Sequence, residues 1–381
     1  MSLNIAIAGG GIAGNLAAIS FARSGHRVSI YEPYPGVEAI GGFMTLWPNA
    51  TGGLIELGLG DWVESCERLE TSRMKTWRGE TLKELPMGEL GKRLGAPVIC
   101  VARHRFTSAL NERLPEGAQV IKEPVDGAGM HGDKVLVTSP SGEAEYDLLV
   151  LADGQRSRNR SLVVPSWPLH YQGRSSFHGL ARMEDLDVTS NHFTEVHGRG
   201  QRFGYFRVSA THCGWYATIS MRISDIPKPE DYAAFLLEHY EGWPDTVRRL
   251  FELTDPARIR PIAIHTCKPL PSWHRGRMVL MGDAAHPMTP DLGQGACQAI
   301  EDALCLPQAV MQNETMEPAL AAYERQRRPR TARLMKQSRI MGKVSNFRNP
   351  LLVSLRFMML KSLSAEKSLD GFAAMIRPEA G

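Results

Sequence analysis

The feature that most constrains the fold is a strand–turn–helix–strand unit at the start of the chain. An apolar run at residues 4–8 predicts a central parallel strand. The sequence Gly9-Gly-Gly-Ile-Ala-Gly14 follows it and matches the GxGxxG pattern. Residues 15–24 carry helical apolar spacing, and residues 27–31 predict a second strand. Together they predict a dinucleotide-binding α/β domain.

The glycines and the acid that closes this unit have separate tasks. Gly9 allows a tight turn, Gly11 lets a pyrophosphate approach the backbone, and Gly14 lets the helix pack closely on the strand. Free N–H groups at the helix start favour an anion. Glu32 can accept hydrogen bonds from both ribose hydroxyls, which indicates a ribose without a 2′-phosphate. The unit therefore predicts NAD or FAD and does not separate them.

A second glycine-rich helix start lies much later in the chain. Residues 278–281 predict a strand that leads into Gly282-Asp283, and Gly293-Gln-Gly295 opens a predicted helix. Residues 146–152 predict a further buried strand that ends in Asp153. The carboxyl ends of strands in one parallel sheet converge on the ligand. The pattern indicates either a second ligand or the far end of a long one.

These motifs, in this order, resemble those of the single-component FAD-dependent monooxygenases. The set comprises GxGxxG with Glu32, then Arg103, then Asp153-Gly-x-x-Ser-x-x-Arg160, then GDAAHPMTPDLGQG at residues 282–295. The family has the p-hydroxybenzoate hydroxylase fold, and its salicylate, urate and 3-hydroxybenzoate hydroxylase branch is the nearest. The resemblance extends from residue 1 to about residue 340.

The resemblance implies a set of FAD contacts: Gly9, Gly11, Ile12, Ala13, Gly14, Glu32, Arg103, Asp153, Asp283, Gly293, Gly295 and Ala296. Arg103 would contact the pyrophosphate region, with Arg105 as the competing candidate. Asp283 would hold the ribityl and pyrophosphate part. The helix near Gly295 would direct its N–H groups at the flavin ring and favour its reduction. Pro290 would lie beside the reactive ring carbon, although a simple turn role is equally expected.

The reaction implied by the resemblance needs NADH or NADPH and O2. The reduced flavin would form a C4a-hydroperoxide that hydroxylates a small aromatic or heteroaromatic compound. Two alternatives stay open, a halogenase or reductase on the same fold and a flavin-binding protein without turnover. The halogenase needs a WxWxIP motif and a lysine near residue 80, and neither Trp77-Arg78 nor Lys83 forms that pattern.

The predicted fold is a Rossmann-like FAD-binding domain with a parallel sheet, an inserted, mostly antiparallel substrate sheet, and a C-terminal helical segment. The expected FAD-binding domain is discontinuous and comprises residues 1–72, 101–171 and 269–340. The expected substrate domain comprises residues 73–100 and 172–268, and the helical tail residues 341–381. We expect the Met-rich stretch within this tail to pack on the FAD domain or on a dimer partner, with a membrane-surface helix as the alternative.

Two tyrosines of the substrate sheet are candidate hydrogen-bond partners or bases for a phenolic substrate. Strand alternation places Tyr205 on one face with Phe203 and Arg207, and Tyr216 on a face of the neighbouring strand. Simple sheet packing is the competing interpretation for both tyrosines, since aromatic residues are enriched in strands.

Composition narrows the possible partners and location. A net charge of +3 gives no argument for nucleic acid, and we expect the basic run at residues 325–330 to be a solvated helix face. The six cysteines lack metal-ligand spacing, which indicates reduced thiols, no metal site and a cytoplasmic location. No run is long and apolar enough for a membrane span. Monomer and homodimer both stay open.

Overall fold

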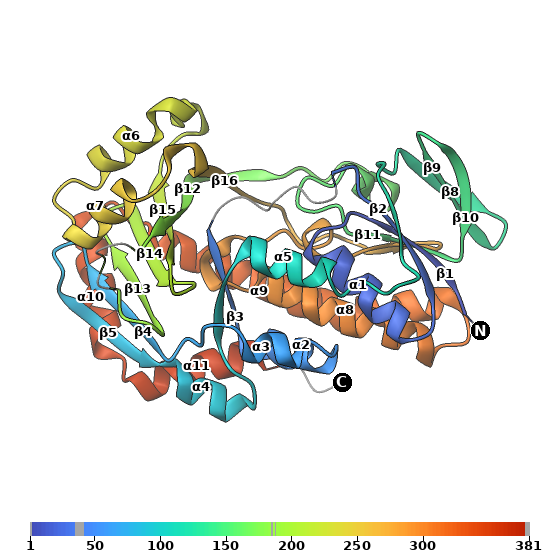
Figure 1. Cartoon of the computed structure of the whole chain (residues 1–381), viewed down its shortest axis with the longest axis horizontal. Coiled ribbons are helices and arrows are strands. Elements are labelled where there is room, and N and C mark those ends of the chain that lie inside the picture. Colours follow the sequence, from blue (N-terminus) through green and yellow to red (C-terminus); the bar gives the residue numbers. More distant parts are fainter. Residues whose placement is uncertain (1, 35–41, 184–185, 187, 378–381) are drawn as a thin grey trace.

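The computed structural model describes residues 2–34, 42–183, 186 and 188–377. Residues 35–41 of the expected FAD domain and 378–381 of the tail lie outside the described residues. A mainly parallel sheet lies at one end of the molecule and a mainly antiparallel sheet at the other (Figure 1). Long helices run between them, which confirms the predicted α/β fold class.

The first sheet has six strands in the order β17-β18-β11-β1-β2-β7. Their bounds are His274–Arg275 for β17, Met278–Leu280 for β18, Leu148–Leu151 for β11, Asn4–Ala8 for β1, Arg27–Tyr31 for β2 and Gln119–Ile121 for β7. All neighbours are parallel except β17 with β18. The central strand β1 is covered on both faces, with Ile5, Ala6 and Ile7 fully buried. This burial explains why β1 reads as a continuous apolar run.

Helices α1 (Ile12–Arg23) and α8 (Gly295–Gln312) pack against each other beside this sheet (Figure 1). The smaller helices of this part are α2 (Pro48–Glu56), α3 (Gly60–Glu64) and α5 (Arg103–Asn111). The strand pair β3 (Phe43–Leu46) and β6 (Ile99–Ala102) leads from it toward the second sheet. An antiparallel meander, β8 (Gly127–His131), β9 (Lys134–Ser139) and β10 (Gly142–Tyr146), extends from the outer end of the first sheet.

The second sheet has seven strands in the order β16-β12-β15-β14-β13-β4-β5. Their bounds are Arg260–Thr266, His170–Arg182, His212–Ser220, Gln201–Arg207, His192–His197, Thr71–Thr76 and Thr81–Pro86, in that order. Helices α6 (Tyr232–His239) and α7 (Asp245–Glu252) cover one face through an apolar cluster that includes Phe177, Phe203 and Trp215. Helix α4 (Met87–Leu94) packs near β4. Segments far apart in the chain therefore meet in one sheet.

Three further helices complete the chain: α9 (Met316–Ser345), α10 (Pro350–Ser362) and α11 (Ala365–Ile376). Helix α8 continues through Pro307, and helix α9 continues through Pro329. Helices α10 and α11 both contact β5 of the second sheet. Helix α11 also contacts the expected FAD domain, because Phe372 stacks on Trp47 and Arg330 donates to the Ile376 carbonyl at 3.0 Å. The Met-rich helix α10 itself contacts the second sheet.

The basic run at residues 325–330 is only in part the solvated face that the sequence suggested. Arg325 is exposed, whereas Arg327 is 3% exposed and Arg330 is 2% exposed. Arg327 donates to Asp302 at 2.8 Å, and Arg330 donates to Glu301 at 2.7 Å. The expectation was wrong for these two arginines because the carboxylates that pair with them lie on α8, which packs alongside α9.

Candidate active site

The turn between β1 and α1 forms a narrow cradle at the carboxyl edge of the first sheet. Gly9 has φ +102°, and a Cβ there would lie 2.6 Å from the Ala152 carbonyl oxygen. A Cβ on Gly14 would overlap the Gly9 carbonyl oxygen. By contrast, a Cβ on Gly11 would meet no atom within 4 Å, and Gly11 is exposed. The turn is therefore closed on its protein side and open where an anion would approach the backbone.

Glu32, at the end of β2, reaches back to this turn. Its Oε2 accepts a hydrogen bond from the Gly10 amide at 2.8 Å, and its Oε1 accepts one from the Tyr34 amide at 2.9 Å. The side chain stays partly exposed. A carboxylate fixed beside the glycine turn, with free lone pairs, is placed to accept ribose hydroxyls.

Asp283 follows β18 and lies close to two arginines. Arg160 donates to the Asp283 carbonyl at 3.2 Å and to the Ala284 carbonyl at 2.8 Å. Asp283 is exposed, yet the protein around it limits its hydration and raises the pKa of its carboxyl; His286, Arg103 and Arg160 act in the opposite direction. The competing candidate Arg105 lies instead near Cys66. The charge of Arg103 therefore acts on Asp283 and that of Arg105 on Cys66; a contact of Arg103 with a ligand stays a prediction.

Asp153 follows β11 and closes the same edge of the sheet. Its Oδ2 accepts hydrogen bonds from the Asn159 side-chain amide at 3.1 Å and the Asn159 backbone amide at 3.3 Å. Its Oδ1 is buried and has no partner within the described residues. A buried carboxylate oxygen without a hydrogen bond is costly unless a ligand or water supplies one.

The second glycine-rich helix start lies against the first. A Cβ on Gly282 would lie 2.8 Å from the Ala13 side chain, and one on Gly295 would lie 3.9 Å from Asp283 Oδ1. Gly293 has φ +63°, which allows the turn that precedes α8. The two glycine-rich loops, separated by most of the chain, thus border the same space.

The predicted cofactor residues share access to solvent, although they lie at the ends of buried elements. Of the twelve, only Gly14 is buried. The glycine cradle, the unpartnered Asp153 oxygen and the exposed Asp283 carboxylate fit a dinucleotide whose phosphates would meet one loop and whose flavin would meet the other. Whether each of these residues contacts FAD stays a prediction.

The two tyrosine candidates lie on opposite faces of the second sheet. Tyr205 pairs in register with Trp215 and packs on the side that α6 and α7 cover. Tyr216 pairs with Gly204, and its ring lies over this glycine on the other face. Arg207 lies on the Tyr205 side, where its Nε donates to the Ser209 carbonyl at 3.2 Å. The structure does not bring Tyr205 together with the cofactor residues.

An aromatic group surrounds Tyr216 on its own face. The ring centroids of Phe43, His178 and Phe193 lie 6.1, 6.2 and 6.5 Å from that of Tyr216. Burial, reinforced by the charge of nearby Arg103, lowers the pKa of His178 to about 4. A Cβ on Gly42 would lie 2.5 Å from His178 Nδ1, and the Gly42 carbonyl accepts from the Arg103 amide at 3.4 Å, so this face of the sheet lies near Arg103.

A buried ion cluster holds Tyr216 and the turn after Pro290 together. Arg202 bonds Asp291 Oδ1 at 2.8 Å and Glu195 at 3.2 Å, and Arg174 donates to Asp291 Oδ2. The Tyr216 hydroxyl donates to Glu195. Burial and the neighbouring Glu195 raise the pKa of Tyr216 well above its ordinary value. Burial alone would raise the Glu195 pKa, but Arg202 and the other partners hold it below its usual range.

Several of these residues were not identified from the sequence: Arg174, Arg202, Glu195, Asp291, His178, Phe43 and Phe193. Asp291 was adjacent to the predicted Pro290, and alternation along β14 would have grouped Arg202 with Gly204. Gly204 was the sequence signal for this face, because a residue without a side chain leaves the space that the Tyr216 ring fills.

The two glycine loops on a parallel sheet, with a second, mostly antiparallel sheet, define the fold of a dinucleotide-binding flavoprotein. Comparisons with known proteins agree. The profile of the family described as FAD binding domain matches residues 138–338. The chain therefore belongs to this family, and it is a single-component FAD-dependent monooxygenase of the p-hydroxybenzoate hydroxylase fold.

Three relatives illustrate the similarity. The aurachin C monooxygenase/isomerase of Stigmatella aurantiaca is 30% identical, over 96% of this chain and 95% of that protein. The salicylate hydroxylase of Pseudomonas putida is 28% identical, over 92% and 88% of the two chains. The crystal structure of Klebsiella pneumoniae HpxO complexed with FAD and uric acid superposes with a TM-score of 0.92 at 27% identity, over 98% and 96% of the two chains.

Proposed function

We propose that this flavoprotein uses NADH or NADPH and O2 to hydroxylate a small aromatic or heteroaromatic compound. The observation that carries the proposal is the aromatic face around Tyr216, which an ion cluster ties to the turn after Pro290. The names of relatives support it, since salicylate and urate are aromatic ring compounds. Bound FAD would take two electrons from the nicotinamide and pass one atom of O2 to the substrate.

In this reaction the protein would bind and orient the substrate and would exclude water from the site. Arg174 and Arg202 each donate to one carboxylate oxygen of Asp291, so the Pro290 turn keeps a fixed position relative to the second sheet. Rings at Phe43 and Phe193 offer apolar surfaces on which a flat substrate would stack. We propose that Pro290 shapes the site where oxygen is transferred.

Tyr216 is a poor base in this arrangement. Its hydroxyl proton is already shared with Glu195, and its raised pKa disfavours the phenolate. We therefore propose a positioning role, in which the Glu195 carboxylate holds the ring against Gly204 and the ring presents its face or edge to the substrate.

The halogenase alternative gains no support from Lys83. Its Nζ donates to the Leu363 carbonyl and to the Ser368 hydroxyl at 3.2 Å, and it is 9% exposed. This lysine connects β5 to the C-terminal helices instead of facing the cofactor residues.

The test is to mix the FAD-loaded protein with NADH or NADPH, under O2, and with urate, salicylate or a 4-quinolone. We expect at least one compound to stimulate nicotinamide oxidation and to yield a product that carries one atom from ¹⁸O2. Tyr216→Phe should lower product formed per nicotinamide consumed while FAD binding stays unchanged, and Tyr205→Phe on the opposite face is the matched control. Stimulated oxidation without any oxygenated product from a broad panel would contradict the proposal.

A further inference from the structure

Helix α10 exposes apolar side chains where a surface helix normally exposes polar ones. The exposed fractions are 79% for Leu351, 61% for Met358, 56% for Met359, 47% for Leu355 and 41% for Leu352. Helical geometry places all five on one face, roughly 120° wide. A contiguous apolar surface of this kind marks an interaction site.

The helix is firmly held from its other side, so this exposure is built into the fold. Arg356 is 5% exposed, and its guanidinium donates to the Gly198 carbonyl at 2.9 Å and to the Val344 carbonyl at 3.1 Å. Asn349 caps the first turn by accepting from the Leu351 amide at 2.9 Å. Arg356 therefore faces the protein, and the five exposed leucines and methionines face outward.

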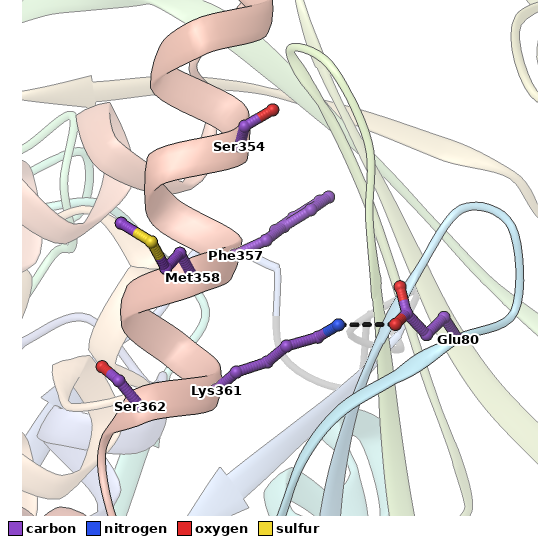
Figure 2. Close-up of a pocket in the computed structure, with 6 residues that line it drawn as sticks. All are labelled: Glu80, Ser354, Phe357, Met358, Lys361 and Ser362. Atoms are coloured by element: carbon purple, nitrogen blue, oxygen red, sulfur yellow. Dashed lines mark hydrogen bonds and ion pairs between the residues drawn. The ribbon is translucent and has the colours of Figure 1, made fainter.

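A groove of about 550 Å³ runs beside α10 (Figure 2). Figure 2 shows Phe357 and Lys361 pointing across it toward the β4–β5 hairpin, where Lys361 pairs with Glu80. The Phe357 ring lies 5.9 Å from that of Trp77. The groove thus adds the Phe357 ring to the apolar surface of α10. Its acidic lining residue, Glu80, is already paired with Lys361.

Positive charge lies beyond the groove, around Trp77. The guanidinium groups of Arg78 and Arg199 each lie 5.5 Å from the Trp77 ring, and both arginines are exposed. Arg199 and Arg348 line a second hollow of about 210 Å³. The acid in that hollow, Asp225, already pairs with Arg222 at 3.0 Å.

The chain around α10 carries only one sign of charge. No Asp or Glu occurs between Glu324 and Glu366, whereas lysines and arginines recur throughout that interval. A second copy docked face to face would bring these cations together, and the nearby carboxylates of Glu80 and Asp225 are already paired with Lys361 and Arg222. An anionic surface would neutralise them, so charge favours a partner that is both apolar and negatively charged.

We propose that α10 is a membrane-surface helix for anionic bilayers. Its Leu and Met face enters the boundary between headgroups and acyl chains, and Arg78, Arg199 and Arg348 contact lipid phosphates. The helix lies on the bilayer and does not cross it. In the described part of the chain no helix is long and apolar enough for a span. This proposal does not depend on which compound the enzyme hydroxylates.

The experiment is cosedimentation of the FAD-loaded protein with vesicles of phosphatidylcholine alone or mixed with phosphatidylglycerol. We expect binding to the mixed vesicles that weakens as salt rises, and little binding to phosphatidylcholine. Met358→Glu should lower the partition coefficient at least about tenfold, because a charge enters the apolar face. The matched control is Met311→Glu at the end of α8, where the methionine is 59% exposed.

A second pair of variants tests the cations. Arg199→Gln combined with Arg348→Gln should weaken binding to the anionic vesicles and flatten its salt dependence, while the flavin spectrum and melting temperature stay unchanged. Equal vesicle binding by the wild type and Met358→Glu would overturn the proposal. So would a wild-type dimer that Met358→Glu converts to a monomer with no vesicle binding by either, because a second copy would then cover α10.

Discussion

The glycine turn after β1 makes a prediction that separates folding from cofactor binding. Gly11→Ala should leave the apoprotein folded but weaken FAD binding, because the added Cβ would point into the open space beside the turn. Gly14→Ala should lower both the stability of the apoprotein and its affinity for FAD, because the added Cβ would overlap the Gly9 carbonyl oxygen inside the protein.

The expected magnitudes follow from these surroundings. A Cβ at Gly11 would keep a phosphate from at least one backbone N–H, and a hydrogen bond to a charged group contributes about 1.5–3 kcal/mol. FAD affinity should therefore fall about 10- to 150-fold. At the start of α1, alanine in place of this glycine costs folding at most about 1 kcal/mol. Gly14→Ala overpacks a closed contact and should cost about 1–3 kcal/mol or more.

Two measurements on the apoprotein distinguish these outcomes. Titration with FAD, followed by quenching of flavin fluorescence, gives the dissociation constant, and thermal unfolding without FAD gives the change in stability. For a chain of 381 residues, 1 kcal/mol corresponds to about 1 °C in melting temperature. Gly52→Ala is the control, since its Cβ would lie at an ordinary 3.7 Å from the Ala96 side chain within α2.

The reasoning fails if Gly11→Ala binds FAD as tightly as the wild type does. It also fails if Gly11→Ala and Gly14→Ala lose stability equally in the apoprotein, because the open side of the turn would then not be the ligand side. Loss of FAD by Gly52→Ala would show that the assay reports general damage instead of local geometry.

Three further predictions concern charges around the site. Asp283→Asn should weaken FAD binding about tenfold or more, measured as flavin lost on gel filtration, and unchanged retention would contradict its role. Arg327→Met leaves Asp302 and Glu301 short of a partner and should destabilise the fold by about 3–5 kcal/mol, or roughly 4–6 °C in thermal unfolding. The pKa of His178 is lowered to about 4, so its contribution to stability is complete above about pH 6.5 and is lost as pH falls toward 4. His178→Asn should remove up to about 3 kcal/mol of this acid sensitivity, and identical unfolding profiles at pH 7 and pH 5 for both proteins would refute it.

The cofactor half of the molecule could be predicted because its signals are local. The turn Gly9–Gly14, the strand end at Glu32 and the strand end at Asp283 each depend on a few consecutive residues. Backbone geometry there requires glycine or an acid, and the order of strands in a parallel sheet brings the motifs together. Such local requirements can be recognised in the sequence even when the motifs that meet in the fold are far apart in the chain.

The sheet face that we propose for the substrate could not be predicted in the same way, because its composition depends on which face of each strand the helices α6 and α7 leave uncovered. Alternation correctly grouped Phe203 with Tyr205, but it did not show that α6 and α7 would cover that side. A large aromatic residue is as suitable for a core as for a ligand face. Only the register, which pairs Tyr216 with Gly204, assigns Tyr216 to the other side.

The buried ion cluster around Asp291 could not be predicted from the sequence for a related reason. Asp291 belongs to the turn after Pro290, whereas its partners Arg174 and Arg202 lie on β12 and β14, and nothing in the local pattern links them. Burying these ions costs desolvation, which only close pairing offsets. Two arginines on one carboxylate therefore fix the distance between the Pro290 turn and the second sheet. In the proposed reaction that constraint, which a hydrophobic contact would not impose as narrowly, would give a substrate lying between them a defined position relative to Pro290.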